Sequence, residues 1–181
     1  MKIYTKKGDQ GYTSNIKGEP IKKSEALLEL QGTIDEANAA IGYLRSLMEG
    51  AYPDLEDGLR DIQYALFRMG SDVTYGFTQK LIIEEDVSVL ETEIDRMTGA
   101  FGVQTTFLYY SGHQTATYAQ LARSIIRRGE RAFVRAYVGD DYPMDLKYLN
   151  RLADYMYALG RYLNHIHGVV EEKMTIRDEK A

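Results

Sequence analysis

The sequence predicts an all-α protein, folded as an antiparallel, up-and-down bundle of about five helices. Apolar residues recur at alternating steps of four and three in several segments, which is the spacing of one buried helix face. Prolines and glycines separate these segments, so short turns can join successive helices. No alternation of strand-like and helix-like runs indicates a layered α/β sheet.

The composition is that of one domain, because 181 residues, 44% hydrophobic and 27% charged, can build a substantial core. The net charge of -5 argues against nucleic acid as the main partner and leaves room for a local basic pocket that binds a phosphorylated small molecule. The absence of cysteine excludes disulfides, thiolate metal sites and cysteine nucleophiles. No signal-peptide core or membrane-length apolar run is present, so we expect no membrane partner and a cytoplasmic location.

Three apolar seams define helices most clearly. The first begins after Ser24 and ends near Gly50, the second opens with Pro53, and the last opens with Pro143. The residues predicted to be buried are Leu30, Ile34, Ala37, Ile41, Leu44 and Met48, then Leu55, Leu59, Ile62, Leu66, Met69 and Val73, and finally Leu149, Leu152, Met156, Leu159 and Leu163. Between them, a helix near 84–99 buries Val87, Leu90, Ile94 and Met97, and another extends to about Val138.

Residues 1–24 are glycine-rich and basic, and we expect them to form a loop ahead of the bundle over 25–168. The glycines allow close backbone approach, and the amides, hydroxyls and lysines of this loop could cradle phosphates. The Gly-x4-Gly-Lys-[Ser/Thr] spacing of a P-loop is absent, and a flexible basic N-terminus is the plainer explanation. The tail over 169–181 is charged, and we expect it to be loosely held.

The segment Leu121–Arg135 has five arginines within thirteen positions. A helix would place Arg123, Arg127, Glu130 and Arg131 on one face, and Leu121, Ile125 and Ala132 on another that could enter the core. Arginine suits the planar, multi-donor binding of phosphate or carboxylate. A charged outer face with Glu130 as its counterion is the alternative.

Asp35 lies beside the apolar seam of the first helix, and Asn38 follows three residues later. A carboxylate near a core needs a partner, and an arginine on another helix is the simplest one. A solvated Asp-Glu pair on the helix surface is the alternative.

Residues 99–114 are the least regular stretch. Phe107, Tyr109 and Tyr110 could line a site for a large flat ligand, or form a hydrophobic strap that closes one end of the bundle. From the residues alone we favour the strap. The histidines show no metal-ligand spacing, so we expect a surface role for His113, His165 and His167.

Four segments together resemble the PduO-type ATP:cob(I)alamin adenosyltransferases. Tyr4-Thr-Lys-Lys-Gly-Asp-Gln-Gly-Tyr-Thr-Ser is similar to the family's opening motif, and Gly32-Thr-Ile-Asp-Glu-Ala-Asn to its second. Ala122-Arg-Ser-Ile-Ile-Arg-Arg-Gly-Glu-Arg and Tyr148-Leu-Asn-Arg-Leu-Ala-Asp-Tyr-Met-Tyr are similar to the third and fourth. The segments occur in family order and span nearly the whole chain.

The resemblance implies a five-helix bundle that forms a homotrimer, with active sites between subunits and a nucleotide-binding loop at the N-terminus. It also implies transfer of the 5′-deoxyadenosyl group of ATP to the cobalt of a reduced corrinoid, cob(I)alamin, with release of triphosphate. The ligands would be ATP, Mg²⁺ and cobalamin, the last as substrate.

The resemblance also assigns roles to single positions. The ATP-binding positions would be Thr5, Lys6, Gly8, Asp9, Gly11, Thr13, Ser14, Lys23, Arg127, Glu130 and Asn150, and Glu130 would also hold the Mg²⁺. The catalytic positions would be Arg127, Arg123, Asp35 and Phe107. Arg123 would pair with Asp35 at the junction of corrinoid and ATP, and Phe107 would occupy the lower face of cobalt and exclude the axial base.

Several positions depart from the family pattern. Tyr110-Ser111-Gly112 stands where the family has Pro-Gly-Gly, and the other departures are Lys7, Pro20, Leu27, Gln120 and Gly129. Because most of these changes fall on the corrinoid loop and the N-terminal basic residues, they leave open a different corrinoid, slow turnover, or a bundle that binds ATP or a corrinoid without catalysis. A purely structural oligomeric bundle is a separate alternative.

Overall fold

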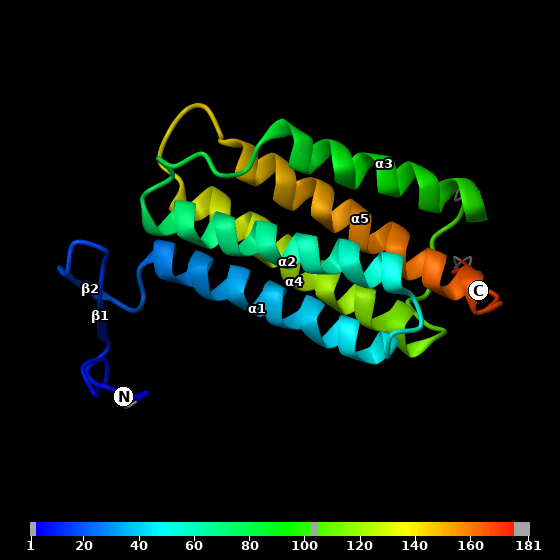
Figure 1. The fold of residues 1–181 in the computed structure, drawn as a ribbon, viewed down its shortest axis with the longest axis horizontal. Coiled ribbons are helices and arrows are strands. Elements are labelled where there is room, and N and C mark those ends of the chain that lie inside the picture. The colour runs from blue at the N-terminus through cyan, green and yellow to red at the C-terminus, as the bar shows by residue number, and fades with distance from the viewer. Residues whose placement is uncertain (1–2, 103–104, 176–181) are drawn as a thin grey trace, which may run out of the picture.

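The computed structural model describes residues 3–102 and 105–175, and its ribbon is mostly helical (Figure 1). The five helices are α1 (Ala26–Met48), α2 (Pro53–Thr74), α3 (Glu84–Phe101), α4 (Gln114–Ala136) and α5 (Met144–Ile166). The predicted helical bundle is therefore confirmed.

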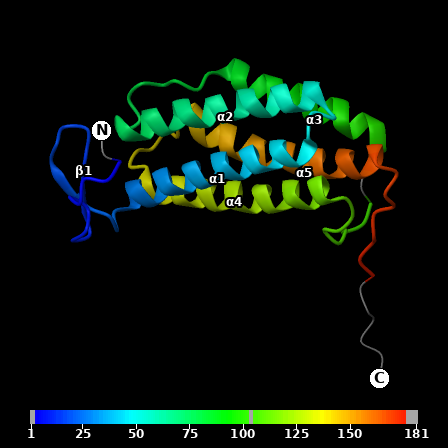
Figure 2. The same cartoon turned by 60° about the horizontal axis from the view of Figure 1, so that its bottom comes forward.

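Successive helices run in opposite directions, but their order in space differs from their order in the chain. The central helix α4 packs between α1 and α5, while α2 packs on α1 and α3 packs on α5. Figures 1 and 2 show that α3 and α5 consequently run side by side in the same direction. The up-and-down prediction thus holds for helix direction, and it is wrong for which helices are neighbours.

The core is built from the predicted seams. Every residue predicted for the seams of α1, α2 and α5 is buried. Hydrophobic burial of this kind is the main source of helix stability in a bundle, since isolated helices of this length are marginal in water. In α3 the prediction holds for Val87, Leu90 and Met97, whereas Ile94 is only partly buried.

The buried face of α4 differs from the predicted one. Ala122, Ile126 and Phe133 face the core, whereas Leu121 is 52% exposed and Ile125 is only partly buried. Of the predicted core residues on this helix, Ala132 alone is buried. The buried residues follow a three-four rhythm from Ala119, and their small side chains gave a weaker signal than Leu121.

The N-terminal segment contains a hairpin that the predicted loop did not include. The strands β1 (Tyr12–Ser14) and β2 (Pro20–Lys22) pair antiparallel, with Thr13 opposite Ile21. At the turn, the Asn15 side chain accepts hydrogen bonds from the amides of Lys17 and Glu19, at 3.0 and 2.9 Å. Three-residue strands are too short to show an alternating pattern. The hairpin projects beyond the bundle, from the end at which α1 begins (Figures 1 and 2).

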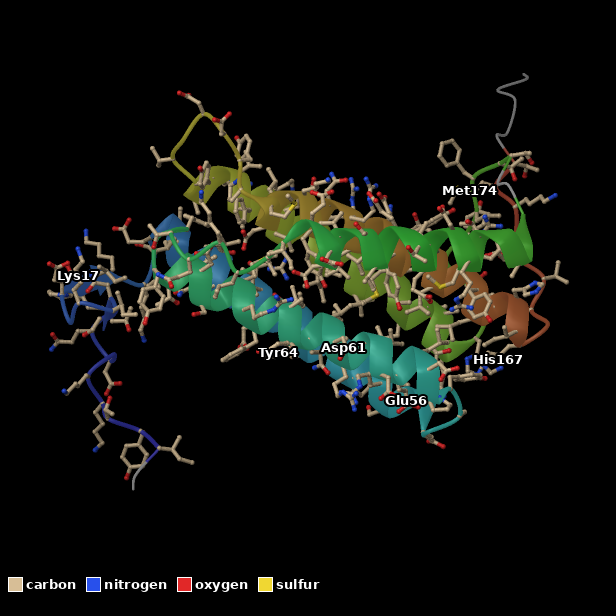
Figure 3. All side chains as sticks on the ribbon, turned by 45° about the horizontal axis from the view of Figure 1, so that its top comes forward. Lys17, Glu56, Asp61, Tyr64, His167 and Met174 are labelled. Atoms are coloured by element: carbon tan, nitrogen blue, oxygen red, sulfur yellow. The ribbon has the colours of Figure 1, made fainter. Side chains whose placement is uncertain are left out.

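The C-terminal tail is held against the bundle over its described residues, so the expectation of a loose tail is wrong there. Residues 172–174 lie beside residues 107–109, with Leu108 and Lys173 in an antiparallel bridge. Figure 3 shows Met174 near the end of α3, far from Lys17 in the hairpin. The remaining tail residues, 176–181, lie outside the described residues.

Candidate functional site

The N-terminal loop brings three of the predicted ATP-binding residues together. The Gly11 amide donates to the Gly8 carbonyl at 3.3 Å, and the Lys23 amide donates to the Gly11 carbonyl at 2.9 Å. A side chain at Gly8 would come within 2.8 Å of the Lys23 ammonium, so glycine allows that ammonium to fold over the loop. Gly11 has φ +81°, a conformation that favours glycine. Loop amides and an ammonium gathered in this way can bind an anion.

The other predicted residues of this segment lie on the same projecting loop and hairpin. Thr5, Lys6 and Asp9 are exposed, and Thr13 and Ser14 lie on β1. The hairpin packs extensively against none of the described helices. Within one chain, the loop therefore presents its polar groups to solvent rather than to α4.

On the bundle itself, the structure brings two predicted residues into direct contact. The Asn150 side-chain amide, on α5, donates to a Glu130 carboxylate oxygen on α4 at 2.9 Å. Within the described ranges, no hydrogen bond occupies the second Glu130 oxygen or the Asn150 side-chain carbonyl, so both could serve as oxygen ligands for a hard cation such as Mg²⁺. Among the described residues, no group of three or more histidines and carboxylates forms a complete metal site.

Arg127 lies on the exposed side of α4, one turn before Glu130 and Arg131. Its backbone carbonyl accepts a hydrogen bond from the Arg131 guanidinium at 2.9 Å. Its own guanidinium has no hydrogen-bond or ion-pair partner in the described part of the chain. Arg127 is therefore free to bind an anion, whereas Arg131 already donates to the backbone.

The predicted Asp35–Arg123 pair is not formed within one chain. Asp35 is exposed on α1, and Arg123 donates to the Tyr110 hydroxyl at 3.3 Å. The Arg123 guanidinium also lies over the rings of Tyr110 and Tyr157, at 5.7 and 5.4 Å. The register between α1 and α4 explains the difference. Glu36, next to Asp35, forms an ion pair with Arg128. Arg123 lies more than one helical turn from Arg128 along α4.

Phe107 is 76% exposed, although its backbone is fixed by a hydrogen bond from the Met174 amide at 2.8 Å. Tyr109 and Tyr110 are also about half exposed, whereas Leu108, between Phe107 and Tyr109, is buried. The three aromatic rings therefore do not close the end of the bundle, and the strap that the residues alone favoured is wrong for them. We refer to these three exposed rings, of which Tyr110 contacts Arg123, as the exposed aromatic surface.

Sequence reasoning missed the residues that hold this aromatic loop. Asn164 on α5 accepts from the His113 amide and donates to the Ser111 carbonyl, both at 3.0 Å. Gly112, at φ +112°, packs so closely on Asn164 that a side chain there would overlap it. In the sequence, the only sign of this role was that a polar residue, Asn164, directly follows Leu163, the last residue predicted to be buried in this helix.

Two departures from the family pattern have structural roles in this chain. Gln120 is buried, and its side-chain amide donates to the Tyr157 carbonyl at 3.3 Å. The side-chain amide of Gln120 fits there because Gly160, which has no side chain, faces it. Gly129 is buried where α4 meets Thr33 of α1.

His165 is exposed, as expected, whereas His113 and His167 have structural contacts that a plain surface role did not predict. The rings of His113 and His167 stack at 3.5 Å, and the Tyr52 hydroxyl lies 2.9 Å from His167 Nε2. Burial, reinforced by the neighbouring His113, lowers the pKa of His167 below its ordinary value. None of these groups contacts the predicted site residues.

A small hollow lies beneath the aromatic loop and is lined by Tyr109, Tyr110 and Gln120. Larger hollows lie away from the predicted ATP-binding and catalytic residues. One of about 870 Å³ lies among α2, α3 and α5 and is lined by Asp57, Arg96 and Tyr155, among others. None of the predicted ATP-binding or catalytic residues lines it. In the described part of the chain no helix has the length and apolar character needed to cross a membrane.

Comparison with known proteins decides the family. The sequence pattern of the family described as cobalamin adenosyltransferase matches residues 3–163, which include all the predicted site residues. This chain belongs to the cobalamin adenosyltransferase family. The corrinoid adenosyltransferase of Bacillus subtilis is 37% identical over 174 residues, which cover 93% of this chain and 90% of that protein. The human corrinoid adenosyltransferase is 32% identical over 189 residues, covering 99% of this chain and 75% of that protein.

Solved structures of the cobalamin adenosyltransferase family share the fold. A phenylalanine-to-alanine variant of the PduO-type ATP:corrinoid adenosyltransferase from Lactobacillus reuteri, complexed with cobalamin and ATP, superposes with a TM-score of 0.88. The two chains are 30% identical, and the match covers 97% of this chain and 100% of that one. An arginine-to-lysine variant of the same protein, complexed with ATP, gives a TM-score of 0.86 at 31% identity.

Proposed function

We propose that this chain transfers the 5′-deoxyadenosyl group of ATP to the cobalt of cob(I)alamin, giving adenosylcobalamin and triphosphate. The observation that carries the proposal is the match along nearly the whole chain to an adenosyltransferase whose structure contains both cobalamin and ATP. The resemblance of four motifs, and the contacts among the residues that they supply, support the assignment of roles.

ATP would be held from two sides. The loop from Thr5 to Ser14, with the Lys23 ammonium folded over Gly8, offers amides, hydroxyls and positive charge to the phosphates. Arg127 offers a planar set of donors with no competing partner among the described residues. The Glu130–Asn150 pair supplies oxygens for the Mg²⁺ of MgATP, since Mg²⁺ is usually bound through one or two carboxylates plus substrate phosphates.

We further propose that the chain works as a homotrimer with sites between subunits. The projecting hairpin, the exposed Asp35 and the exposed Arg127 are polar groups that leave the site incomplete within one chain. A neighbouring chain could bring its N-terminal loop to α4 and its Arg123 to Asp35, forming between chains the pair that is absent within one.

The chemistry explains why these residue types suffice. Cob(I)alamin is itself a strong nucleophile, so its electron pair forms the cobalt–C5′ bond, and the C5′–oxygen bond breaks with its pair leaving on triphosphate. No general base and no protein nucleophile is required. The protein supplies alignment of C5′ with cobalt and stabilises the charge of the leaving triphosphate, for which Arg127 and Lys23 are suited.

The exposed aromatic surface would face the corrinoid. Phe107 would occupy the lower face of cobalt, where an apolar ring excludes the axial base and makes Co(II) easier to reduce. Arg123 would lie between this surface and the nucleotide, since it already contacts Tyr110 of the same loop.

The test is an anaerobic assay with purified protein, MgATP, cob(II)alamin and a reductant, followed by visible absorbance. We expect the spectrum of adenosylcobalamin to appear. A change in the Co(II) spectrum without product would instead indicate a protein that binds both ligands without catalysis. No spectral change would contradict the proposal for cobalamin.

A further inference from the structure

The C-terminal tail forms a short two-stranded pairing with the loop that carries Phe107. The Tyr109 amide donates to the Glu172 carbonyl at 2.9 Å, and the Met174 amide donates to the Phe107 carbonyl at 2.8 Å. Between these bonds Leu108 faces the interior, so Phe107 must face outwards, because successive side chains of an extended segment alternate. The tail backbone therefore determines which way the Phe107 ring points.

The tail is itself fixed by one ion pair with little exposure to solvent. The Arg161 guanidinium donates to one Glu171 carboxylate oxygen through two nitrogens, at 3.0 and 2.8 Å. The two side chains are only 11% and 20% exposed. Solvent and salt screen such a pair much less than an exposed one, and removing one partner leaves the other charge without compensation.

Arg161 also holds the opposite side of the same loop. Its guanidinium lies 4.2 Å from the centre of the Phe101 ring, at the last residue of α3. One side chain on α5 thus contacts both the helix end that precedes the Phe107 loop and the tail that pairs with that loop.

We propose that Arg161 and Glu171 are positioning residues for adenosyl transfer, which act by holding Phe107 against the lower face of the corrinoid. This inference rests on the proposed function. Neither residue touches the reacting atoms. They act on Phe107 through the tail backbone. Their loss should therefore impair the exclusion of the axial base from cobalt and leave ATP binding unchanged.

The far side of the loop has an independent anchor, which makes the proposal testable in a folded protein. Asn164 bonds Ser111 and His113 without involving the tail. Loss of the ion pair should therefore release the segment around Phe107 and leave the start of α4 in place.

The experiment compares Glu171→Gln and Glu171→Asp with the wild-type protein. We expect Glu171→Gln to lower kcat about tenfold or more, while the KM for ATP changes less than about twofold, because the lost interaction concerns only the cobalt step. With MgATP present, cob(II)alamin should also lose much of the spectral change caused by removal of the axial base. Glu171→Asp keeps the negative charge, so it should retain more of the wild-type kcat and of the Co(II) spectral change than Glu171→Gln does.

Asp86→Asn is the matched control, because Asp86 pairs with Arg68 at similar burial, 18% and 25% exposed, and joins α2 to α3 away from the tail. It should retain wild-type kcat and the wild-type Co(II) spectrum. The inference would be overturned if Asp86→Asn and Glu171→Gln lost kcat and the Co(II) spectral change equally. It would also be overturned if Glu171→Gln kept the wild-type kcat and spectrum. A wild-type protein that makes no product would instead contradict the proposed function.

A second variant covers the case in which Glu171→Gln does not fold. Met174→Pro removes the amide that donates to the Phe107 carbonyl and leaves the Arg161–Glu171 pair in place. The same loss of the Co(II) spectral change is expected. An unchanged spectrum in this variant overturns the inference.

Discussion

Arg127 and Arg131 lie on one face of α4, yet their surroundings differ. Arg131 donates to the Arg127 carbonyl, whereas the Arg127 guanidinium has no partner in the described part of the chain. We expect Arg127→Ala to lower adenosyl transfer by at least about 100-fold, because it removes a donor for the leaving triphosphate. The absorbance assay measures the rate. Arg131→Ala is the control and should retain most activity; an active Arg127→Ala protein would contradict the assigned role.

Asp145, at the start of α5, is completely buried, and neither of its carboxylate oxygens has a hydrogen-bond partner among the described residues. Burial, together with the nearby Asp72, raises the pKa of Asp145 to about 6 from 3.8. Because the folded state then binds a proton more tightly than the unfolded state, the ionised carboxyl destabilises the fold above pH 6. This penalty is relieved as the pH falls towards 4.

Asp145→Asn should therefore stabilise the protein, by about 1–3 kcal/mol at pH 8, since it removes a buried charge without a paired partner. The advantage should shrink through pH 6 and vanish near pH 4. Urea denaturation at several pH values measures it. The exposed Asp140→Asn serves as control, and an advantage that does not depend on pH would show that folding does not raise the pKa of Asp145.

The residues at the site were predictable only where a motif named them. Arginine spacing indicated the exposed face of α4, and the Glu130–Asn150 contact agrees with two motif positions that lie 20 residues apart. The contacts of Arg123 with Tyr110 and Tyr157 depend on a loop, which has no periodicity to read. Asp145 gave no signal at all, because an aspartate in the first turn of a helix is ordinarily a favourable and exposed residue.

Among the helices, α4 has a glycine at a buried position. A side chain at Gly129 would lie 3.5 Å from the Thr33 methyl group, an ordinary contact. We expect Gly129→Ala to raise stability by about 0.5–1 kcal/mol, because alanine restricts the unfolded chain and favours the helix. Denaturation at a fixed protein concentration measures this change.

Gly160→Ala on α5 is the contrasting substitution. There a side chain would overlap the Gln120 amide and come within 3.0 Å of the Ala116 carbonyl. This variant should be destabilised by about 1–3 kcal/mol, which is typical of overpacking. A Gly129→Ala protein as unstable as Gly160→Ala would show that α1 and α4 pack more tightly than described.

The buried faces of helices α1, α2 and α5 were fully predictable, because large apolar residues repeat at regular spacing through each of these helices. In α4 most buried residues are small, and four of the nine are alanines, which alone do not distinguish a buried from an exposed face. The tail was misjudged because its pairing with residues 107–109 is made by backbone groups, which composition does not report.

For the whole molecule, the proposed trimer gives a direct expectation. Light scattering should give three times the 20.6 kDa of one chain. Asp35→Ala should weaken assembly or adenosyl transfer without changing the helical content, since Asp35 is exposed within the chain and makes no ion pair among the described residues. A monomer of full activity would contradict intersubunit sites. An Asp35→Ala protein identical to wild type would show that its pairing with Arg123 is not required.

The spatial order of the helices was not predictable from their seams. Apolar spacing shows that each helix has one buried face, but it does not show which neighbour that face contacts. The long connection between α3 and α4 permits α4 to lie between α1 and α5, and the parallel pair of α3 and α5 follows from that choice.

The direction of α4 has a further consequence. This helix begins beside the aromatic loop and ends at the end of the bundle from which the hairpin projects, so Arg123, Arg127 and Glu130 follow one another from the one end towards the other. A helix advances about 1.5 Å per residue, which fixes about 10 Å between the first and the last of them. In the proposed site, one rigid helix would thus set the spacing between the corrinoid and the phosphates, and a single-residue insertion after Ser124 would rotate Arg123 away from the face that carries Arg127 and Glu130.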